Sequence, residues 1–365
     1  MSRAVIKLGS SVVADERGEP RRGELAAVCA LIAGRHRLGE EPIVVTSGAI
    51  AHGMRAMEIA ERPQTIGELQ AASAVGQGRL YRIYEELFAA EGVHSAQVLL
   101  TFFDMSARTH YLNARQTLDT LIDWRVVPVI NENDTTTTDE ITFGDNDFLA
   151  AQVAVLTGSD RLILLTDIDG LYTADPRRDP AAQPVAEVSD FAALEELKIT
   201  RTTSPLGSGG MRSKVIAAEM ATAAGIETVI CNGLDAGAVE AALEGRPAGT
   251  RFVAGPARYS SFKLWLKYAK PVRGRLRIDA GAVRALLEQS ASLLPVGIVA
   301  VDGEFEAGDA IEILAAHGDE PLAKGICSFS AAELRSIAGL NSREAAERLP
   351  GAAQEAVHRD YLVLS

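Results

Sequence analysis

The chain has 365 residues, of which 47% are hydrophobic and 5% aromatic, and its formal net charge is −13. This length predicts two domains, or one large domain with a smaller attachment, and the apolar content suffices for a packed core. The acidic balance argues against a protein whose main task is to bind a nucleic-acid backbone, which requires a basic surface. Anionic small substrates remain compatible, because a few focused basic side chains outweigh a distant net charge.

Short apolar runs rich in β-branched residues recur along the chain and predict strands buried on both faces of a parallel sheet. They are AVIKL (4–8), PIVVT (42–46), AQVLLT (96–101), VVPVI (126–130), LILLT (162–166) and ETVIC (227–231). Segments with helical periodicity lie between them, such as 66–90 and 113–124. The alternation predicts right-handed βαβ units, and so an α/β fold of the three-layer αβα sandwich type with a mainly parallel sheet.

The pattern changes near residue 255. The stretch 256–278 has seven basic residues and no acid, and the following short alternating runs with Gly and Asp turns predict a compact β-rich domain. From Pro271 onward there are 9 basic and 14 acidic residues, which favours a linker or an interface over a nucleic-acid contact. We therefore expect a domain at 1–255, a basic linker at 256–272 and a small domain with a C-terminal tail at 273–365.

The three cysteines, Cys29, Cys231 and Cys327, are widely spaced and form no CxxC motif. We therefore expect neither a zinc site nor a disulfide framework. We expect small buried cysteines in a reducing cytosol instead. We expect no signal peptide, because Lys7 interrupts the first apolar run, and no membrane span, because no run of about 18 apolar residues occurs.

Polar residues collect where the predicted strands end. GSS, TSGAI, NEND, TDIDG and CNG each follow an apolar run. The carboxyl ends of parallel strands form the edge at which open α/β sheets bind ligands. Strand ends also need turn residues, so any single case has a structural explanation, and only the repetition favours a binding site.

The stretch from Asn131 to Asp147 contains six acids and three asparagines but no Lys or Arg. A solvated loop is one interpretation, and Asp145 or Asn146 could cap the helix that follows. NEND and GDND together are better explained by a ligand, because carboxylates and amides suit an ammonium group or the waters of Mg²⁺.

Two lysines occur where a phosphate could bind. Lys7 interrupts an apolar strand before a Gly-Ser-Ser turn. A lysine at this position could stabilise a transferring phosphoryl group. The alternative is a lysine on an edge strand with its amine in water. Lys214 is the last residue of the glycine-rich run PLGSGGMRSK, which leads into a helix and could bind phosphates through its backbone N–H groups. That run is not a Walker A loop, and a flexible loop explains it equally well.

These motifs together resemble a known family. KLGSS, VTSGAIAHG, NARQTL, PVINENDT, FGDNDFLAA, LLTDIDGLYTADPR and GSGGMRSK occur in the order seen in glutamate 5-kinases, of the amino acid kinase superfamily. The resemblance covers residues 1 to about 255. The remainder, with LLPVGI, GDAIEI and VHRDYLVL, resembles the PUA domain that follows the kinase in bacterial members.

The resemblance implies ATP-dependent phosphorylation of the L-glutamate γ-carboxylate to L-glutamyl 5-phosphate, the first step of proline biosynthesis. It implies that Lys7 and Lys214 neutralise the transferring phosphoryl group and that Asp147 positions them. Ser47, Asp134 and Asn146 would hold glutamate. The residues implied at the nucleotide are Lys7, Thr166, Asp167, Ser208, Gly209, Gly210, Met211, Arg212, Ser213 and Lys214. A γ-carboxylate is already an anion at pH 7, since its reference pKa is about 4.3, so no general base is needed.

The resemblance also implies Mg²⁺ bound with ATP rather than in a protein site, proline as an inhibitor, a homo-oligomer, and a cytoplasmic enzyme. Transient contact with glutamyl phosphate reductase is a further hypothesis, and no role follows for the PUA domain. A kinase for another small acceptor is the nearest alternative. An amino-acid sensor that binds RNA through the PUA domain is a more distant one, which the retention of Lys7, Asp147 and Lys214 disfavours.

Overall fold

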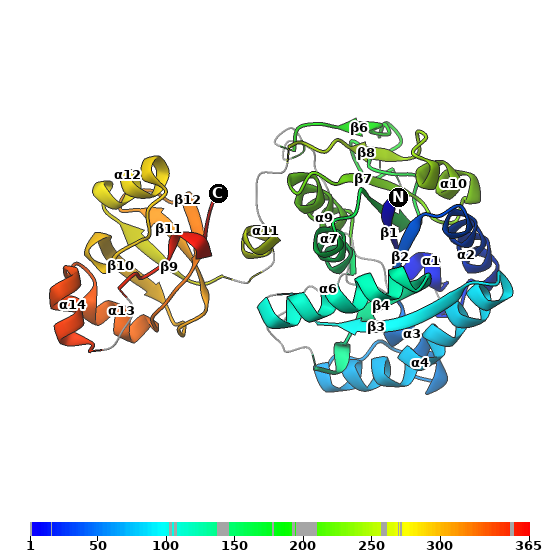
Figure 1. Ribbon diagram of the computed structural model, residues 1–365, viewed down its shortest axis with the longest axis horizontal. Coiled ribbons are helices and arrows are strands. Elements are labelled where there is room, and N and C mark those ends of the chain that lie inside the picture. Colours follow the sequence, from blue (N-terminus) through cyan, green and yellow to red (C-terminus); the bar gives the residue numbers. More distant parts are fainter. Residues whose placement is uncertain are drawn as a thin grey trace. The chain divides into compact units, whose positions relative to one another are not determined.

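The six predicted apolar runs form six of the eight strands of one sheet (Figure 1). The computed structural model describes residues 2–15, 17–101, 104–105, 108–136, 146–176, 179–191, 194, 210–256, 261–268, 270, 272–350 and 354–365. The chain divides into two units, Met1–Arg258 and Tyr259–Ser365. The domain boundaries expected at 255 and 273 stay a prediction.

The sheet of the first unit is almost entirely parallel. Its strands are β1 (Arg3–Leu8), β2 (Glu41–Thr46), β3 (His94–Leu100), β4 (Val126–Glu132), β5 (Arg161–Thr166), β6 (Glu187–Val188), β7 (Glu227–Asn232) and β8 (Thr250–Phe252). Their order is β3-β4-β2-β1-β5-β7-β8-β6, and among these described strands only the pair β7 and β8 is antiparallel. β1 therefore lies at the centre, and its carboxyl end faces the ends of β2 and β5.

Helices cover both faces of this sheet, as the αβα prediction requires (Figure 1). The helices are α1 (Ser10–Val13), α2 (Arg22–Arg37), α3 (Ala49–Ala56), α4 (Ile66–Ala90), α6 (Arg108–Asp123), η1 (Asp134–Thr136), α7 (Asn146–Thr157), α9 (Met211–Ala223) and α10 (Ala236–Glu244). α4 and α10 contact α2 on one face, while α6 and α9 contact α7 on the other. The predicted fold class of this unit is confirmed.

Side-chain alternation along β1 explains why a lysine occurs in a central strand. Ile6 and Leu8 belong to the apolar cluster that includes Leu25 and Tyr84 of the α2 and α4 layer. Successive side chains of a strand point to opposite faces, so Lys7 points toward the layer of α7 and α9. Lys7 is buried, with 3% of its surface exposed, so the edge-strand alternative is wrong.

One strand differs from the prediction of burial on both faces. β3 is the edge strand of the sheet, and most of its residues are half-buried or exposed. Leu99 has 38% of its surface exposed. The apolar run correctly predicts a strand, but composition alone does not distinguish an edge strand from a central one.

The second unit contains a five-stranded sheet, in agreement with the predicted β-rich domain. Its strands, in the order β10-β9-β11-β12-β13, are β9 (Val272–Ile278), β10 (Ile298–Gly303), β11 (Ala310–Ala315), β12 (Pro321–Ile326) and β13 (Leu362–Leu364). Its helices are α11 (Ser261–Tyr268), α12 (Ala280–Gln289), η2 (Pro295–Gly297), α13 (Ala331–Ile337), α14 (Ser342–Arg348) and η3 (Arg359–Tyr361). The stretch expected to be a basic linker thus contains the helix α11.

All three cysteines are buried and free, as expected. Burial raises the pKa of the Cys29 and Cys231 thiols to about 12, with a smaller effect of Glu91 and Asp235 respectively. Because the thiolate is the reactive form, we expect iodoacetamide at pH 8 to leave both residues unmodified in the native protein. Mass spectrometry of tryptic peptides checks this, with urea-unfolded protein as the positive control. Rapid native alkylation of either residue would contradict their burial.

No helix in the described part of the chain is both long and apolar enough to cross a membrane.

Candidate functional site

The polar ends of β1, β2, β4 and β5 lie at one edge of the sheet, where α7 and α9 also begin. α9 starts at Met211 with Gly210 as its N-cap, and α7 starts at Asn146. The free N–H groups and the dipole of a helix N-terminus favour anions. This edge therefore combines helix N-termini with the residues that sequence analysis selected.

Asp147 lies between the two lysines at the centre of this edge. Its Oδ1 is 2.5 Å from the Lys7 Nζ, and its Oδ2 accepts a hydrogen bond of 2.9 Å from the Lys214 Nζ. Ser213 Oγ donates to the same Oδ2 at 3.3 Å. Asp147 has no exposed surface, and 6% of the Lys214 surface is exposed. One carboxylate thus pairs with two ammonium groups. They belong to the first and the last of the motifs quoted above, KLGSS and GSGGMRSK.

The charge state of Asp147 follows from this arrangement. Burial alone raises the pKa of the carboxyl, but the charges of Lys214 and Lys7 and their hydrogen bonds outweigh it and hold the pKa well below its usual range. The carboxylate is therefore ionised at pH 7. With two lysines and one aspartate, the cluster carries a net positive charge that suits a phosphoryl group.

A second, amide-rich cluster adjoins the first. Asn146 Nδ2 donates to the Thr46 carbonyl at 2.6 Å, to Asn131 Oδ1 at 2.8 Å and to Ser47 Oγ at 3.1 Å. Gly48 follows with φ of +108°, a conformation that L-residues rarely adopt. A Cβ at Gly48 would lie 3.1 Å from Val13 Cγ1, a tight contact, so the backbone conformation is the main reason for glycine in TSGAI. The turn after β2 is thereby directed toward Asn146.

Asp134 lies near this second cluster, at the start of η1. Its Oδ2 accepts a hydrogen bond of 2.5 Å from Ser73 Oγ on α4. Burial raises the pKa of the Asp134 carboxyl, and the Ser73 hydrogen bond and Arg62 offset this only in part. The side chain is half-buried, so it can accept a further donor from a ligand. The predicted residues Ser47, Asp134 and Asn146 thus lie along one connected edge of the site.

The expected nucleotide residues are only partly described. Thr166 is buried at the end of β5 and donates from its hydroxyl to Oδ1 of the exposed Asp167 at 3.2 Å. β5 pairs with β1, so Thr166 lies next to the Lys7 strand. Ser208 and Gly209 lie outside the described residues. Gly210 is the N-cap of α9, and Met211 and Arg212 are its first residues. Ser213 and Lys214, which follow them, contact Asp147.

Sequence analysis missed three residues of the second cluster: Ser73, Gln77 and Asn131. Gln77 Oε1 accepts a hydrogen bond of 2.5 Å from Asn131 Nδ2. Ser73 and Gln77 are one helical turn apart on α4, and the four-residue spacing puts them on one face. The sequence did contain a signal for Ser73 and Gln77, namely two polar residues four positions apart in a helix with an apolar face.

The geometry supports phosphoryl transfer between two anions. Two buried ammonium groups and two helix N-termini can neutralise phosphate oxygens, and such transfers depend on positioning and positive charge more than on covalent chemistry. Among the described residues, no group of three or more His, Cys, Asp or Glu could hold a metal ion. The acid at the centre of the site is already paired with both lysines.

Comparisons with known proteins agree with this geometry. Residues 2–232 match the amino acid kinase family and residues 274–349 match the PUA domain. Glutamate 5-kinase of Meiothermus ruber is 44% identical over 365 residues, which cover 100% of this chain and 96% of the relative. Glutamate 5-kinase of Cupriavidus taiwanensis is 46% identical over 364 residues, covering 99% of this chain and 97% of the relative.

A solved structure supports the fold independently. UMP kinase from Bacillus anthracis superimposes with a TM-score of 0.50 at 16% identity, covering 69% of this chain and 96% of that protein. At this identity the likeness concerns the fold alone. The matches over the full length are of a different order: the chain belongs to the amino acid kinase family and, within it, to the glutamate 5-kinases that carry a PUA domain.

Proposed function

We infer that this protein transfers the γ-phosphoryl group of ATP to the γ-carboxylate of L-glutamate and so makes L-glutamyl 5-phosphate, the first step of proline biosynthesis. The observation that carries the proposal is the buried Lys7–Asp147–Lys214 cluster at the ligand-binding edge of the sheet. Full-length relatives named glutamate 5-kinase support the choice of acceptor.

In this reaction Lys7 and Lys214 would bind the oxygens of the transferring phosphoryl group. Asp147 would hold the two ammonium groups at a fixed separation, so that little reorganisation is needed when charge develops. The glutamate γ-carboxylate attacks as an anion, and no side chain has to remove a proton from it. The start of α9 would add backbone N–H groups to the same phosphates.

Glutamate would bind at the second cluster. Asp134 supplies a carboxyl group for its ammonium group, and the hydroxyl of Ser47 suits a carboxylate oxygen. Asn146 has an amide oxygen that is buried without a hydrogen-bond partner among the described residues, so it can accept a donor from the substrate. Thr166, Asp167 and the segment from Ser208 to Lys214 would line the nucleotide.

Magnesium would enter with the nucleotide. We expect it to be held mainly by the phosphates of ATP and by water, the usual arrangement for this ion in kinases. When bound, Mg²⁺ neutralises charge on the phosphates. The residues of the chain then bind, align and shield the reacting groups.

The remaining expectations rest on the family alone. We place the catalytic domain at 1–255, the linker at 256–272 and the PUA domain at 273–365. We also propose inhibition by proline, a homo-oligomer and a cytoplasmic location.

We further propose transient contact with glutamyl phosphate reductase, whose substrate is a labile acyl phosphate. Co-sedimentation of the two purified enzymes tests the contact, and its absence together with unchanged coupled flux would contradict it.

The test of the proposed function is an acceptor series. ADP formation is followed in a coupled assay with Mg·ATP and each of L-glutamate, D-glutamate, L-aspartate, N-acetyl-L-glutamate and UMP. We expect kcat/KM for L-glutamate to exceed that of every other acceptor by at least about 100-fold. A higher value for UMP or N-acetyl-L-glutamate would assign the fold to another acceptor. No turnover with any acceptor would favour a sensor.

Replacing Asp134 by Asn should mainly weaken glutamate binding. The change removes the charge that pairs with the substrate ammonium and keeps the side-chain shape, so we expect KM for L-glutamate to rise about 10-fold or more while kcat changes little. Asp123→Asn, on the exposed end of α6, is the matched control. Steady-state kinetics measure both values, and a KM within twofold of the wild type would remove Asp134 from the acceptor site.

A further inference from the structure

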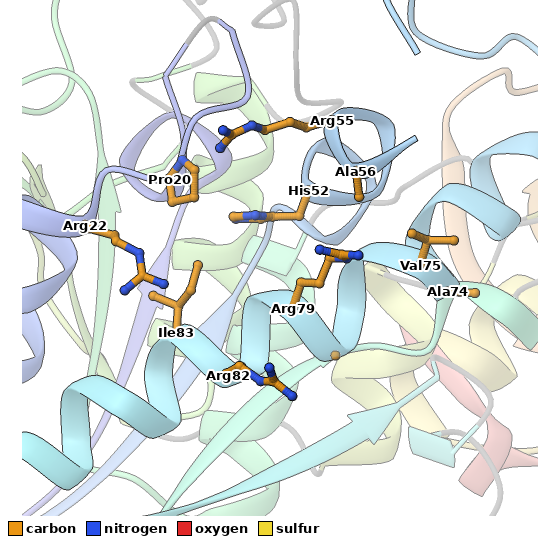
Figure 2. Close-up of a pocket in the computed structure, with 11 residues that line it drawn as sticks. Pro20, Arg22, His52, Arg55, Ala56, Ala74, Val75, Arg79, Arg82 and Ile83 are labelled. Atoms are coloured by element: carbon orange, nitrogen blue, oxygen red, sulfur yellow. The ribbon is translucent and has the colours of Figure 1, made fainter. Parts of the chain in front are cut away.

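A pocket of about 740 Å³ lies away from the proposed phosphoryl-transfer site, between α2, α3 and α4 (Figure 2). None of Lys7, Asp147 and Lys214 lines it. Pockets of this volume are common for small organic ligands. Neither the family comparisons nor the proposed reaction gives it a role.

Four of the residues that line the pocket are arginines: Arg22 of α2, Arg55 of α3, and Arg79 and Arg82 of α4. In Figure 2 Arg55 and Arg79 lie on either side of the imidazole of His52, and Arg22 and Arg82 lie farther from it. Guanidinium groups bind phosphate oxygens in bidentate geometry, which makes arginine the common choice for phosphate recognition. The chain as a whole is acidic, so this local concentration of positive charge is not a consequence of composition.

Only part of this positive charge is balanced by neighbouring acids. Arg55 pairs with Glu19, and Arg22 pairs with Glu86 at 3.2 Å. Among the residues that the structure describes, Arg79 and Arg82 have neither a salt bridge nor a hydrogen bond. Both are exposed one turn apart on α4, so their donors are available to a ligand.

His52 supplies a second and independent indication of a ligand. The side chain has 5% of its surface exposed, and its Nε2 has no hydrogen-bond partner within the described part of the chain. Burial, together with the charges of Arg55 and Arg22, lowers the pKa of His52 to about 4, so the ring is neutral at pH 7. An unpaired buried polar atom is costly, and a bound anion would satisfy it by accepting the imidazole N–H.

The pocket also has an apolar side. Val75 and Ile83 of α4 and Pro20 lie on its wall, next to the arginines. Gly78 lies between them in the middle of α4, where a Cβ would meet no atom within 4 Å. The space beside Gly78 is therefore open.

From these contacts we propose that the pocket binds an organic phosphate, a small molecule that carries two or more phosphoryl charges on an apolar or partly apolar body. A phosphoryl group offers three oxygens, enough to accept from several guanidinium groups and the imidazole at once. The alternative occupant is a carboxylate from a second copy of the chain. It offers only two oxygens, and it would have to reach the buried Nε2 of His52.

The test uses the full-length protein and inorganic pyrophosphate as the probe, with binding measured by isothermal titration calorimetry at low ionic strength. Two variants separate this pocket from the phosphoryl-transfer site: Arg79→Ala/Arg82→Ala and Lys214→Met. We expect the double arginine variant to bind pyrophosphate at least tenfold more weakly at the pocket, and Lys214→Met to retain that binding. Arg37→Ala/Arg115→Ala removes the same charge from exposed helix positions elsewhere and should retain it too.

Two further titrations test which kind of organic phosphate the pocket prefers. GDP and fructose 1,6-bisphosphate are titrated in the same way, and the one that binds more tightly than pyrophosphate identifies the kind of organic body. Pyrophosphate binding that is lost in Lys214→Met but unchanged in the arginine variant would overturn the proposal. So would absence of binding combined with dissociation of an oligomer in the arginine variant, because the pocket would then be an interface.

Discussion

Replacing either lysine of the central cluster by Met is expected to lower kcat by at least about 100-fold, which corresponds to about 2.7 kcal/mol of transition-state stabilisation. Met keeps the length of the side chain and removes its charge. Lys7 and Lys214 are each within 3 Å of Asp147 and buried. The expected loss falls on kcat because the phosphoryl charge that the lysines neutralise is largest in the transition state.

Steady-state and single-turnover kinetics of Lys7→Met and Lys214→Met measure this effect. Lys263→Met, in the second unit, is the control for removal of a lysine outside the site. A kcat within threefold of the wild type in either variant would mean that the lysine concerned does not stabilise the transferring group. A rise in KM alone would assign it to ground-state binding instead.

Replacing Asp147 by Asn is expected to destabilise the first unit strongly. The change leaves two ammonium groups buried without their counter-ion, and removing one partner of a buried ion pair typically costs about 3–5 kcal/mol. The folded pKa of Asp147 lies below its unfolded value, so its stabilising effect is complete at pH 7 and is lost as the pH falls through the folded pKa. The difference between variant and wild type should therefore shrink in strong acid.

Urea unfolding followed by circular dichroism measures this loss. The double variant Asp147→Asn/Lys214→Met serves as the matched control, because it removes one of the two charges that Asp147 compensates. We expect it to be more stable than Asp147→Asn alone, although both should be inactive. Equal stability of the two variants would show that charge burial is not the cause.

Much of the first unit follows from its sequence. Buried strands and long amphipathic helices have strong periodicity, and α4 begins and ends at the two residues expected, Ile66 and Ala90. β6 and β8 were not predicted, because strands of two and three residues carry no detectable period. The helices of the second unit were missed as well, since its short elements alternate with turns and their packing depends on the whole domain.

The central cluster was predictable in composition but not in geometry. Motif order pointed to Lys7, Asp147 and Lys214, yet only the folded sheet shows that one carboxylate contacts both amines. Ser73 and Gln77 were missed because α4 supplies them from a distant part of the sequence. Contacts between residues so far apart depend on topology, which local patterns do not report.

The arginine-lined pocket could not have been predicted from the sequence. Arg22, Arg55, Arg79 and Arg82 come from three helices, and each taken alone looks like a solvated surface residue. His52 lies in the motif VTSGAIAHG, of which the family resemblance assigns only Ser47 to the acceptor. The folded structure shows that His52 is buried, with its Nε2 unpaired among the described residues.

The most direct test of the central claim is to trap the product. The protein is incubated with Mg·ATP, L-glutamate and hydroxylamine, and L-glutamyl γ-hydroxamate is measured together with ADP by mass spectrometry. Transfer to the γ-carboxylate predicts hydroxamate and ADP in equal amounts, with both lost in Lys7→Met and Lys214→Met. ADP formed without hydroxamate would show that the phosphoryl group goes to a different acceptor, and it would contradict the proposed reaction.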